Sequence, residues 1–155
     1  MQPLGNLDPQ VSVLSFHYAW PDAARLNYGL DKVISLNETG FAGHDDATYR
    51  RQAWRFLLAG GGAFNNLDYS FTVGHEDGTG VNDAPGSGSV ALRSQLGALR
   101  RFLQAAPLVA LRPDYATVVH APNAYSQVLS TADRGTVLLY LEGRSEEHTS
   151  ELQSH

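Results

Sequence analysis

Residues 32–41 read KVISLNETGF, and this stretch decides how the rest of the chain is interpreted. Its first half is a short run of apolar residues around Val33, Ile34 and Leu36, which is typical of a buried strand. A glutamate, Glu38, follows the run at once. The stretch therefore predicts a buried strand that carries a carboxylate at its C-terminal end.

Strand-like and helix-like segments alternate on both sides of this stretch. We expect strands within residues 11–19 and 63–71 and helices over 45–59 and 90–104, with a weakly helical piece at 22–31 and a loop at 74–89. In the second helix Leu92, Leu96, Leu99 and Leu103 recur at helical spacing. Gly60 to Gly62 predict the end of the first helix, because glycine takes the left-handed conformation without steric cost. Alternation of this kind indicates parallel strands with helical crossovers.

We interpret residues 1–112 as part of a (β/α)8 TIM barrel, comprising about strands six to eight with their helices. The fold class expected is therefore α/β. Active sites of this fold lie at the C-terminal ends of its strands.

The pattern changes after Pro113. Residues 115–119, 125–131 and 136–141 read as short strands, and the last two are joined at Asp133-Arg134-Gly135, which predicts an antiparallel hairpin. We therefore expect residues 113–143 to begin a C-terminal β-sandwich domain. The final residues, 144–155, read RSEEHTSELQSH, which is what a common sequencing-library adapter encodes in one frame. We expect this tail to be an artefact and the chain to be a fragment.

Composition excludes several classes of function. The formal net charge is −5, and the sequence contains no basic stripe, so binding to nucleic acid is not expected. No stretch approaches the roughly 18 apolar residues of a membrane span, so no membrane partner is expected. The chain has no cysteine, which excludes disulfides and cysteine-ligated metal from this sequence. No phosphate-binding glycine loop is present, and we expect no cofactor and no metal.

Glu38 is the first candidate catalytic residue, as a nucleophile or a base at the end of a buried strand. The alternative is that Glu38 caps the following loop or pairs with an arginine such as Arg50. The preceding strand ends in His17 and Tyr18, followed by Trp20. A histidine or tyrosine there can hydrogen-bond to Glu38, and aromatic rings can stack on sugars. The alternative for these residues is a partly buried histidine among core aromatics.

The third strand leads into polar residues that suit the binding of hydroxyl groups. They include Asn65, Asp68, Tyr69 and His75. His75, Glu76 and Asp77 are adjacent in sequence, and adjacent loop residues seldom converge on one metal ion, so we interpret them as loop or subsite residues.

With these residues placed, the chain resembles the retaining (β/α)8 glycoside hydrolases of the cellulase-like superfamily. The resemblance rests on NETGF at residues 37–41 and on the helix, glycine and strand passage YRRQAWRFLLAGG at 49–61. It implies that Glu38 is the catalytic nucleophile, that Tyr18 or His17 contacts it, and that the parent protein is secreted or periplasmic. The acid/base glutamate of that family has no counterpart here, so we expect the isolated chain to be inactive.

The function expected is hydrolysis of O-glycosidic bonds in a polysaccharide or oligosaccharide, with a carbohydrate as the partner. The sugar subsite would comprise His17, Tyr18, Trp20, Asn65, Asp68, Tyr69 and His75. Two alternatives stay open: a non-catalytic carbohydrate-binding or structural protein, and an unrelated α/β enzyme that uses Glu38 as a general base. The sequence leaves the oligomeric state open.

Overall fold

The computed structural model describes residues 4–39, 41–81, 88–117 and 120–143. The first half of the chain forms β1 (Val13–His17), α1 (Ala23–Asn27), the 3-10 turn η1 (Tyr28–Leu30), β2 (Val33–Glu38), α2 (Asp46–Leu58) and β3 (Ala63–Phe64). The second half forms α3 (Val90–Gln104), the 3-10 turn η2 (Leu108–Ala110), β4 (Arg112–Pro113), β5 (Ala124–Ser130) and β6 (Val137–Gly143).

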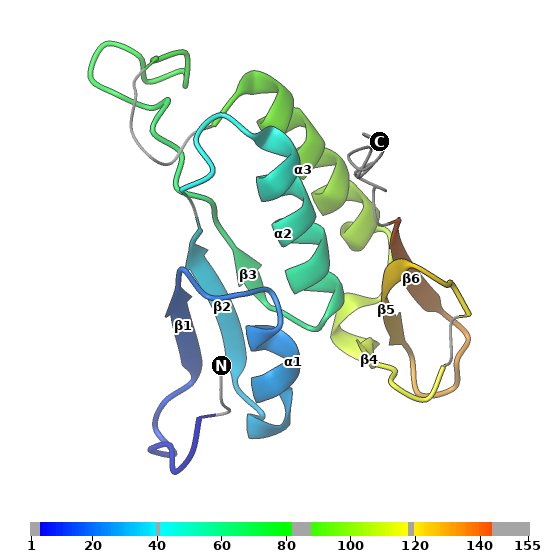
Figure 1. Cartoon of the computed structure of the whole chain (residues 1–155). Helices are drawn as coiled ribbons and strands as arrows, with labels where there is room; N and C mark the ends of the chain where they lie inside the picture. The colour runs from blue at the N-terminus through cyan, green and yellow to red at the C-terminus, as the bar shows by residue number, and fades with distance from the viewer. Residues whose placement is uncertain (1–3, 40, 82–87, 118–119, 144–155) are drawn as a thin grey trace, which may run out of the picture.

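The first three strands form a parallel sheet in the order β1-β2-β3. All three strands run toward the same end of the sheet, and the loops that follow them gather there (Figure 1). One face of the sheet is covered by α1 and α2, through a cluster of Ala24, Ile34, Leu36, Phe56 and Ala59. On the other face Val13 and Val33 are each half exposed. The helices therefore bury one face of the sheet only.

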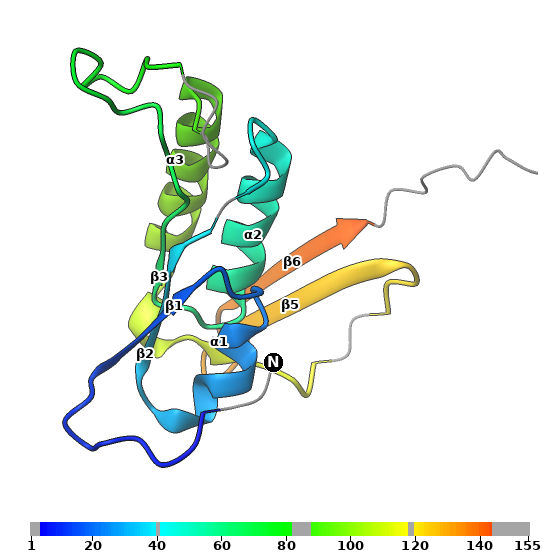
Figure 2. The ribbon, with the colours of Figure 1, turned by 60° about the vertical axis from the view of Figure 1, so that its left-hand side comes forward.

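The last three strands form an antiparallel sheet in the order β4-β5-β6. Helix α2 lies between this sheet and the parallel sheet (Figures 1 and 2). A second core cluster joins α2 and α3 to the antiparallel sheet, and its buried members are Ala53, Leu58, Leu99, Leu103, Leu111 and Leu129. This core contains residues from both sides of the domain boundary expected near residue 112.

The TIM-barrel expectation is contradicted. The described residues form three α-helices and two separate three-stranded sheets, a mixed α/β arrangement. The parallel sheet is open and small, and β3 pairs with β2 through only two residues. The helix that connects β1 to β2, α1, is only five residues long. The alternating pattern in the sequence identified the parallel pairing correctly, but pairing of neighbours does not by itself require a closed barrel.

One expected strand is very short, and another does not form over residues 115–117. The strand within the stretch 63–71 covers only Ala63–Phe64, because the register shifts beyond it: Asn65 N donates to the Leu36 carbonyl, and Leu67 N donates to the Thr39 carbonyl at 2.8 Å. No strand forms at residues 115–117: the Asp114 carboxylate accepts from the backbone N–H groups of Ala116 and Thr117, which closes a turn. Residues 118 and 119 lie outside the described part of the chain.

Other elements match the expectation closely. Helix α3 has the expected bounds, and its Ser89 cap accepts from Leu92 N at 2.8 Å. The hairpin of β5 and β6 turns at the expected residues, where the Asp133 carboxylate accepts from Gly135 N. The adapter-like residues 144–155 lie outside the described residues. Within the described ranges no helix is long and apolar enough to cross a membrane.

Candidate functional site

A β-bulge places Glu38 beside His17 at the C-terminal edge of the parallel sheet. The pairs Val13–Val33 and Ser15–Ser35 are in simple register, but the register shifts after Phe16, so that His17 pairs with Glu38 and not with Asn37. Bulges of this kind redirect side chains and are common next to functional sites. Here the shift brings an imidazole and a carboxylate together from neighbouring strands.

Two side chains hold the Glu38 carboxylate. The Tyr18 hydroxyl donates a hydrogen bond to Oε1, and His17 Nδ1 lies 3.3 Å from Oε2. The Tyr18 backbone N–H also donates to the Glu38 carbonyl at 2.8 Å. Both carboxylate oxygens are therefore engaged from the same neighbouring segment, which fixes the plane of the carboxylate. The Glu38 side chain is 26% exposed, so solvent still reaches it.

Tyr18 adopts a backbone conformation that is rare for a bulky residue. Its φ is +50°, and Phe41, in the loop after β2, has a φ of +65°. Left-handed backbone at non-glycine residues is uncommon, and such strain clusters at binding and catalytic sites. The two rings pack against each other with centroids 4.7 Å apart. The strained segments thus meet directly beside the carboxylate.

Aromatic rings at this edge are open to solvent. Tyr18 is about half exposed, Phe41 is 60% exposed, and Trp20 is 75% exposed. Covering a large apolar side chain lowers the free energy. Exposed rings beside a polar group therefore suit a ligand with both apolar faces and hydroxyl groups. Sugars have this character.

Asn65 follows β3 and also lies at this edge. Its side-chain amide donates to the Asn37 carbonyl at 3.3 Å, and its backbone N–H donates to the Leu36 carbonyl at 2.9 Å. Thr39, the residue after Glu38, is buried, and its hydroxyl oxygen has no hydrogen-bond partner among the described residues. Asn65 therefore joins Glu38, His17 and Tyr18 at the edge, as expected.

The structure gives Asp68 and His75 local structural contacts. The Asp68 carboxylate accepts from Ser70 N at 2.9 Å and pairs with Arg93 of α3 at 3.1 Å. His75 Nδ1 lies 3.2 Å from the Thr79 hydroxyl in an exposed loop. Tyr69 is partly exposed in the same connection. The contacts of Asp68 and His75 stabilise the loop.

The adjacent acids Glu76 and Asp77 serve the same loop. Glu76 accepts from Gly74 N, and Asp77 accepts from the Thr79 hydroxyl and from Thr79 N; these hydrogen bonds hold the pKa of each carboxyl below its usual value. No group of three or more potential ligands occurs for a metal within the described residues. The loop geometry agrees with an interpretation of these acids as turn-forming residues.

Other carboxylates near the edge are already engaged. The Asp45 carboxylate caps α2, and the hydrogen bond from the Thr48 side chain lowers its pKa. Asp46 accepts from the Ser89 hydroxyl. The alternative partner considered for Glu38, Arg50, lies instead against Gln95 at 3.4 Å. Glu38 is therefore the acid best placed to meet a ligand at this edge.

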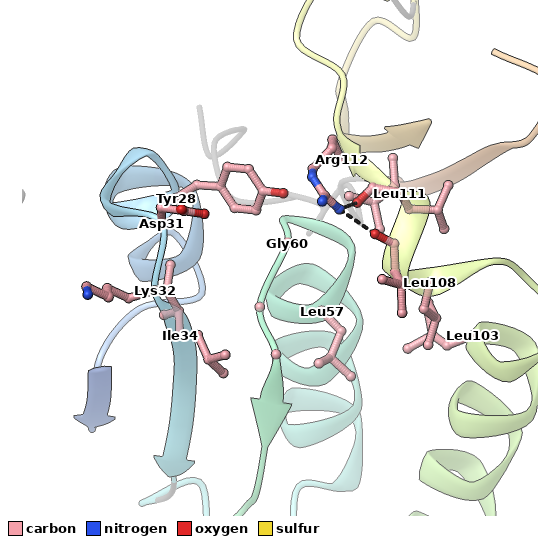
Figure 3. A pocket seen from close by; sticks show the side chains of 15 residues that line it. Tyr28, Asp31, Lys32, Ile34, Leu57, Gly60, Leu103, Leu108, Leu111 and Arg112 are labelled. Atoms are coloured by element: carbon pink, nitrogen blue, oxygen red, sulfur yellow. Dashed lines mark hydrogen bonds between the residues drawn. The ribbon is translucent and has the colours of Figure 1, made fainter. Parts of the chain in front are cut away.

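A cavity lies elsewhere, at the opposite end of the parallel strands. It has a volume of about 620 Å³, and Figure 3 shows β2 running away from it, so that Glu38 lies at the far end of that strand. Sequence reasoning missed this cavity, because residues from four separate segments line it. It also missed the bulge at His17, because no residue pattern in β1 or β2 predicts a bulge.

Comparisons with protein-family models, with curated proteins and with solved structures give no match to this chain.

Proposed function

We propose that this chain carries the nucleophile of a retaining glycoside hydrolase and that the nucleophile is Glu38. The observation that carries the proposal is the pair of contacts from Tyr18 and His17 to the two oxygens of the Glu38 carboxylate at the end of a buried strand. A nucleophilic carboxylate must be fixed in direction, and contacts to both of its oxygens achieve this.

The roles of the neighbours follow from their positions. Glu38 attacks the anomeric carbon and forms a glycosyl ester while the bond to the leaving oxygen breaks. Tyr18 and His17 orient the carboxylate during this attack. Trp20 and Phe41 offer exposed rings on which the apolar face of a sugar can stack, and Asn65 offers an amide for its hydroxyl groups.

Retaining hydrolysis also needs a second carboxyl group, about 5–5.5 Å from the first, to protonate the leaving oxygen. The acids that follow β2 and β3 within the described ranges are engaged in caps, turns, hydrogen bonds or ion pairs, as described above. We therefore expect the chain alone not to hydrolyse natural glycosides. The test must use a leaving group that departs without protonation.

The experiment is covalent labelling of the purified chain with dinitrophenyl glycosides fluorinated at the carbon next to the anomeric centre. Fluorine slows hydrolysis of the glycosyl ester, so the adduct accumulates and peptide mass spectrometry locates it. A panel of gluco, manno, galacto and xylo configurations covers the unknown sugar. We expect an adduct on Glu38 that is absent from Glu38→Gln. Absence of an adduct across the panel, or an adduct on another residue, would contradict the proposal.

A second candidate function is non-catalytic carbohydrate binding. The observation that favours it is Trp20, which is three-quarters exposed and lies two residues after Tyr18 in the chain. In this case oligosaccharides bind to the wild type and to Glu38→Gln with similar affinity, and no fluoroglycoside adduct forms. Trp20→Ala should abolish oligosaccharide binding under both candidate functions. Only the labelling experiment therefore distinguishes the two functions.

A further inference from the structure

The cavity at the N-terminal end of the parallel strands is built between the two sheets. It forms where the glycine run that ends α2 meets η1, η2 and the start of β4. Its volume of about 620 Å³ lies within the range of small-molecule sites, roughly 300–1,000 Å³. The cavity is separate from the Glu38 edge, so the inference below does not depend on the proposed function.

The walls of the cavity are apolar. They are formed by Ile34, Leu57, Leu103, Leu111 and Leu129, which come from β2, α2, α3, the link between η2 and β4, and β5. All five side chains belong to the two core clusters or pack against them. A wall built from the core is held in place by the packing behind it, so the cavity is preformed and suits an aliphatic group.

Two polar groups face each other across the cavity. In Figure 3 the Tyr28 hydroxyl points across it toward the Arg112 guanidinium. The Tyr28 ring is packed so closely over Gly60 that a Cβ there would lie 2.7 Å from it. Within the described residues, the Tyr28 hydroxyl forms no hydrogen bond with the protein. It therefore presents a donor to the space between the two side chains.

Arg112 is held in a fixed orientation with donors to spare. Its Nη1 donates to the carbonyl groups of Val109 at 2.7 Å and Leu111 at 2.8 Å. No described residue accepts from its Nε or Nη2 groups. A guanidinium fixed in this way is suited to bind a carboxylate through two hydrogen bonds.

The charged residues that line the cavity carry a net positive charge. Asp31 and Lys32 are adjacent in sequence and opposite in charge, and the Lys32 ammonium donates to the Pro9 carbonyl. Arg112 is the third charged residue of the lining. An anion is therefore favoured at the polar end, whereas the apolar walls exclude a fully hydrated one.

We propose that this cavity binds an aliphatic carboxylate, with its tail among the leucines and its head between Arg112 and Tyr28. The carboxylate accepts two hydrogen bonds from the guanidinium and one from the Tyr28 hydroxyl. Neither half of the ligand is sufficient alone, because the head supplies orientation and the tail supplies the buried apolar area.

The test is isothermal titration of the whole purified chain with decanoate, with decanol as the neutral analogue and acetate as the head alone. We expect decanoate to bind at least about tenfold more tightly than decanol, since charge-assisted hydrogen bonds contribute about that much. Acetate should not bind measurably. Failure of decanoate to bind, or equal binding of decanol, would overturn the proposal.

Three variants locate the site. Tyr28→Phe removes only the hydroxyl and Arg112→Gln removes the charge, and each should weaken decanoate binding, Arg112→Gln by about tenfold or more.

Leu108→Trp should fill the cavity and abolish binding, whereas Leu139→Trp is the matched control, a leucine of similar exposure outside the cavity. Glu38→Gln should bind decanoate like the wild type. Unchanged binding in Leu108→Trp, with its melting temperature retained, would place the ligand elsewhere and refute the proposal.

Discussion

Arg55 on α2 binds Glu142 on β6 through two parallel hydrogen bonds. Arg55 Nε donates to Oε2 at 2.8 Å, and Nη2 donates to Oε1 at 2.7 Å. The Tyr140 hydroxyl donates to the same carboxylate at 2.7 Å, and the guanidinium lies over the Tyr125 ring, 4.6 Å from its centroid. This cluster fastens the antiparallel sheet to the helix that also covers the parallel sheet, so it couples the two halves of the fold.

Arg55→Lys should destabilise the protein by about 1–2 kcal/mol, because lysine keeps the charge but cannot form the two-pronged contact. The measurement is the free energy of unfolding in urea. The control is Arg50→Lys, whose exposed contact with Gln95 should contribute about 0–1 kcal/mol at most. Equal stability of Arg55→Lys and the wild type would show that the pair does not join the sheets energetically.

The Arg55–Glu142 pair should also make stability depend on pH on the acid side. Burial raises the pKa of Glu142, but the hydrogen bonds from Arg55 and Tyr140 outweigh this effect and hold the pKa below its usual value of 4.5. A carboxyl whose pKa is lowered by folding stabilises the fold above its unfolded pKa, and that contribution is lost as pH falls through the folded pKa. The difference in unfolding free energy between wild type and Glu142→Gln should therefore be full at neutral pH and shrink below about pH 4.5. A difference that grows on acidification would contradict this assignment.

Tyr18→Phe should slow the labelling of Glu38 by a fluoroglycoside by about tenfold, because the variant loses one hydrogen bond to the carboxylate. The ring contact with Phe41 needs no hydroxyl, so the backbone at Tyr18 should be unchanged. The measurement is the rate of adduct formation by mass spectrometry. His75→Ala is the control, since His75 contacts Thr79 in a loop, and it should label at the wild-type rate.

Gly60→Ala should destabilise the fold by about 1–3 kcal/mol. Gly60 has a φ of +96°, and a Cβ there would lie 2.7 Å from the Tyr28 ring and 2.9 Å from Pro113. Gly29→Ala is the matched control, because nothing lies within 4 Å of its Cβ position. Thermal melting of both variants tests this directly. A neutral Gly60→Ala would mean that Tyr28 and Pro113 move aside easily.

Local sequence signals predicted the helices well and the strands less well. The bounds of α3 follow from the Ser89 cap and the leucine spacing, and α2 starts after the Asp45 cap. Helix caps and leucine spacing act between residues that lie within one or two helical turns of each other. Strand length depends on a partner: β3 stops after two residues because the next hydrogen bonds to β2, from Asn65 N to the Leu36 carbonyl and from Leu67 N to the Thr39 carbonyl, shift the register.

The sequence predicted one contact of the candidate site but not the geometry around it. The expected contact between Glu38 and Tyr18 or His17 is present, and both residues take part. Asp68 was expected at the same site but pairs with Arg93, which is 25 residues away in sequence. No local pattern in the loop indicates that an arginine on a later helix will bind this aspartate.

The sequence by itself determined where the helices begin and end, which strand carries Glu38, and where the last hairpin turns, since each depends on neighbours along the chain. The tertiary structure alone decided that the parallel strands form an open sheet, that α2 lies between two sheets, and that a bulge sets Glu38 beside His17. It also decided that a cavity opens at the other end of that sheet. The physical reason is that these features depend on contacts between segments far apart in the chain, where packing and not local preference sets the arrangement.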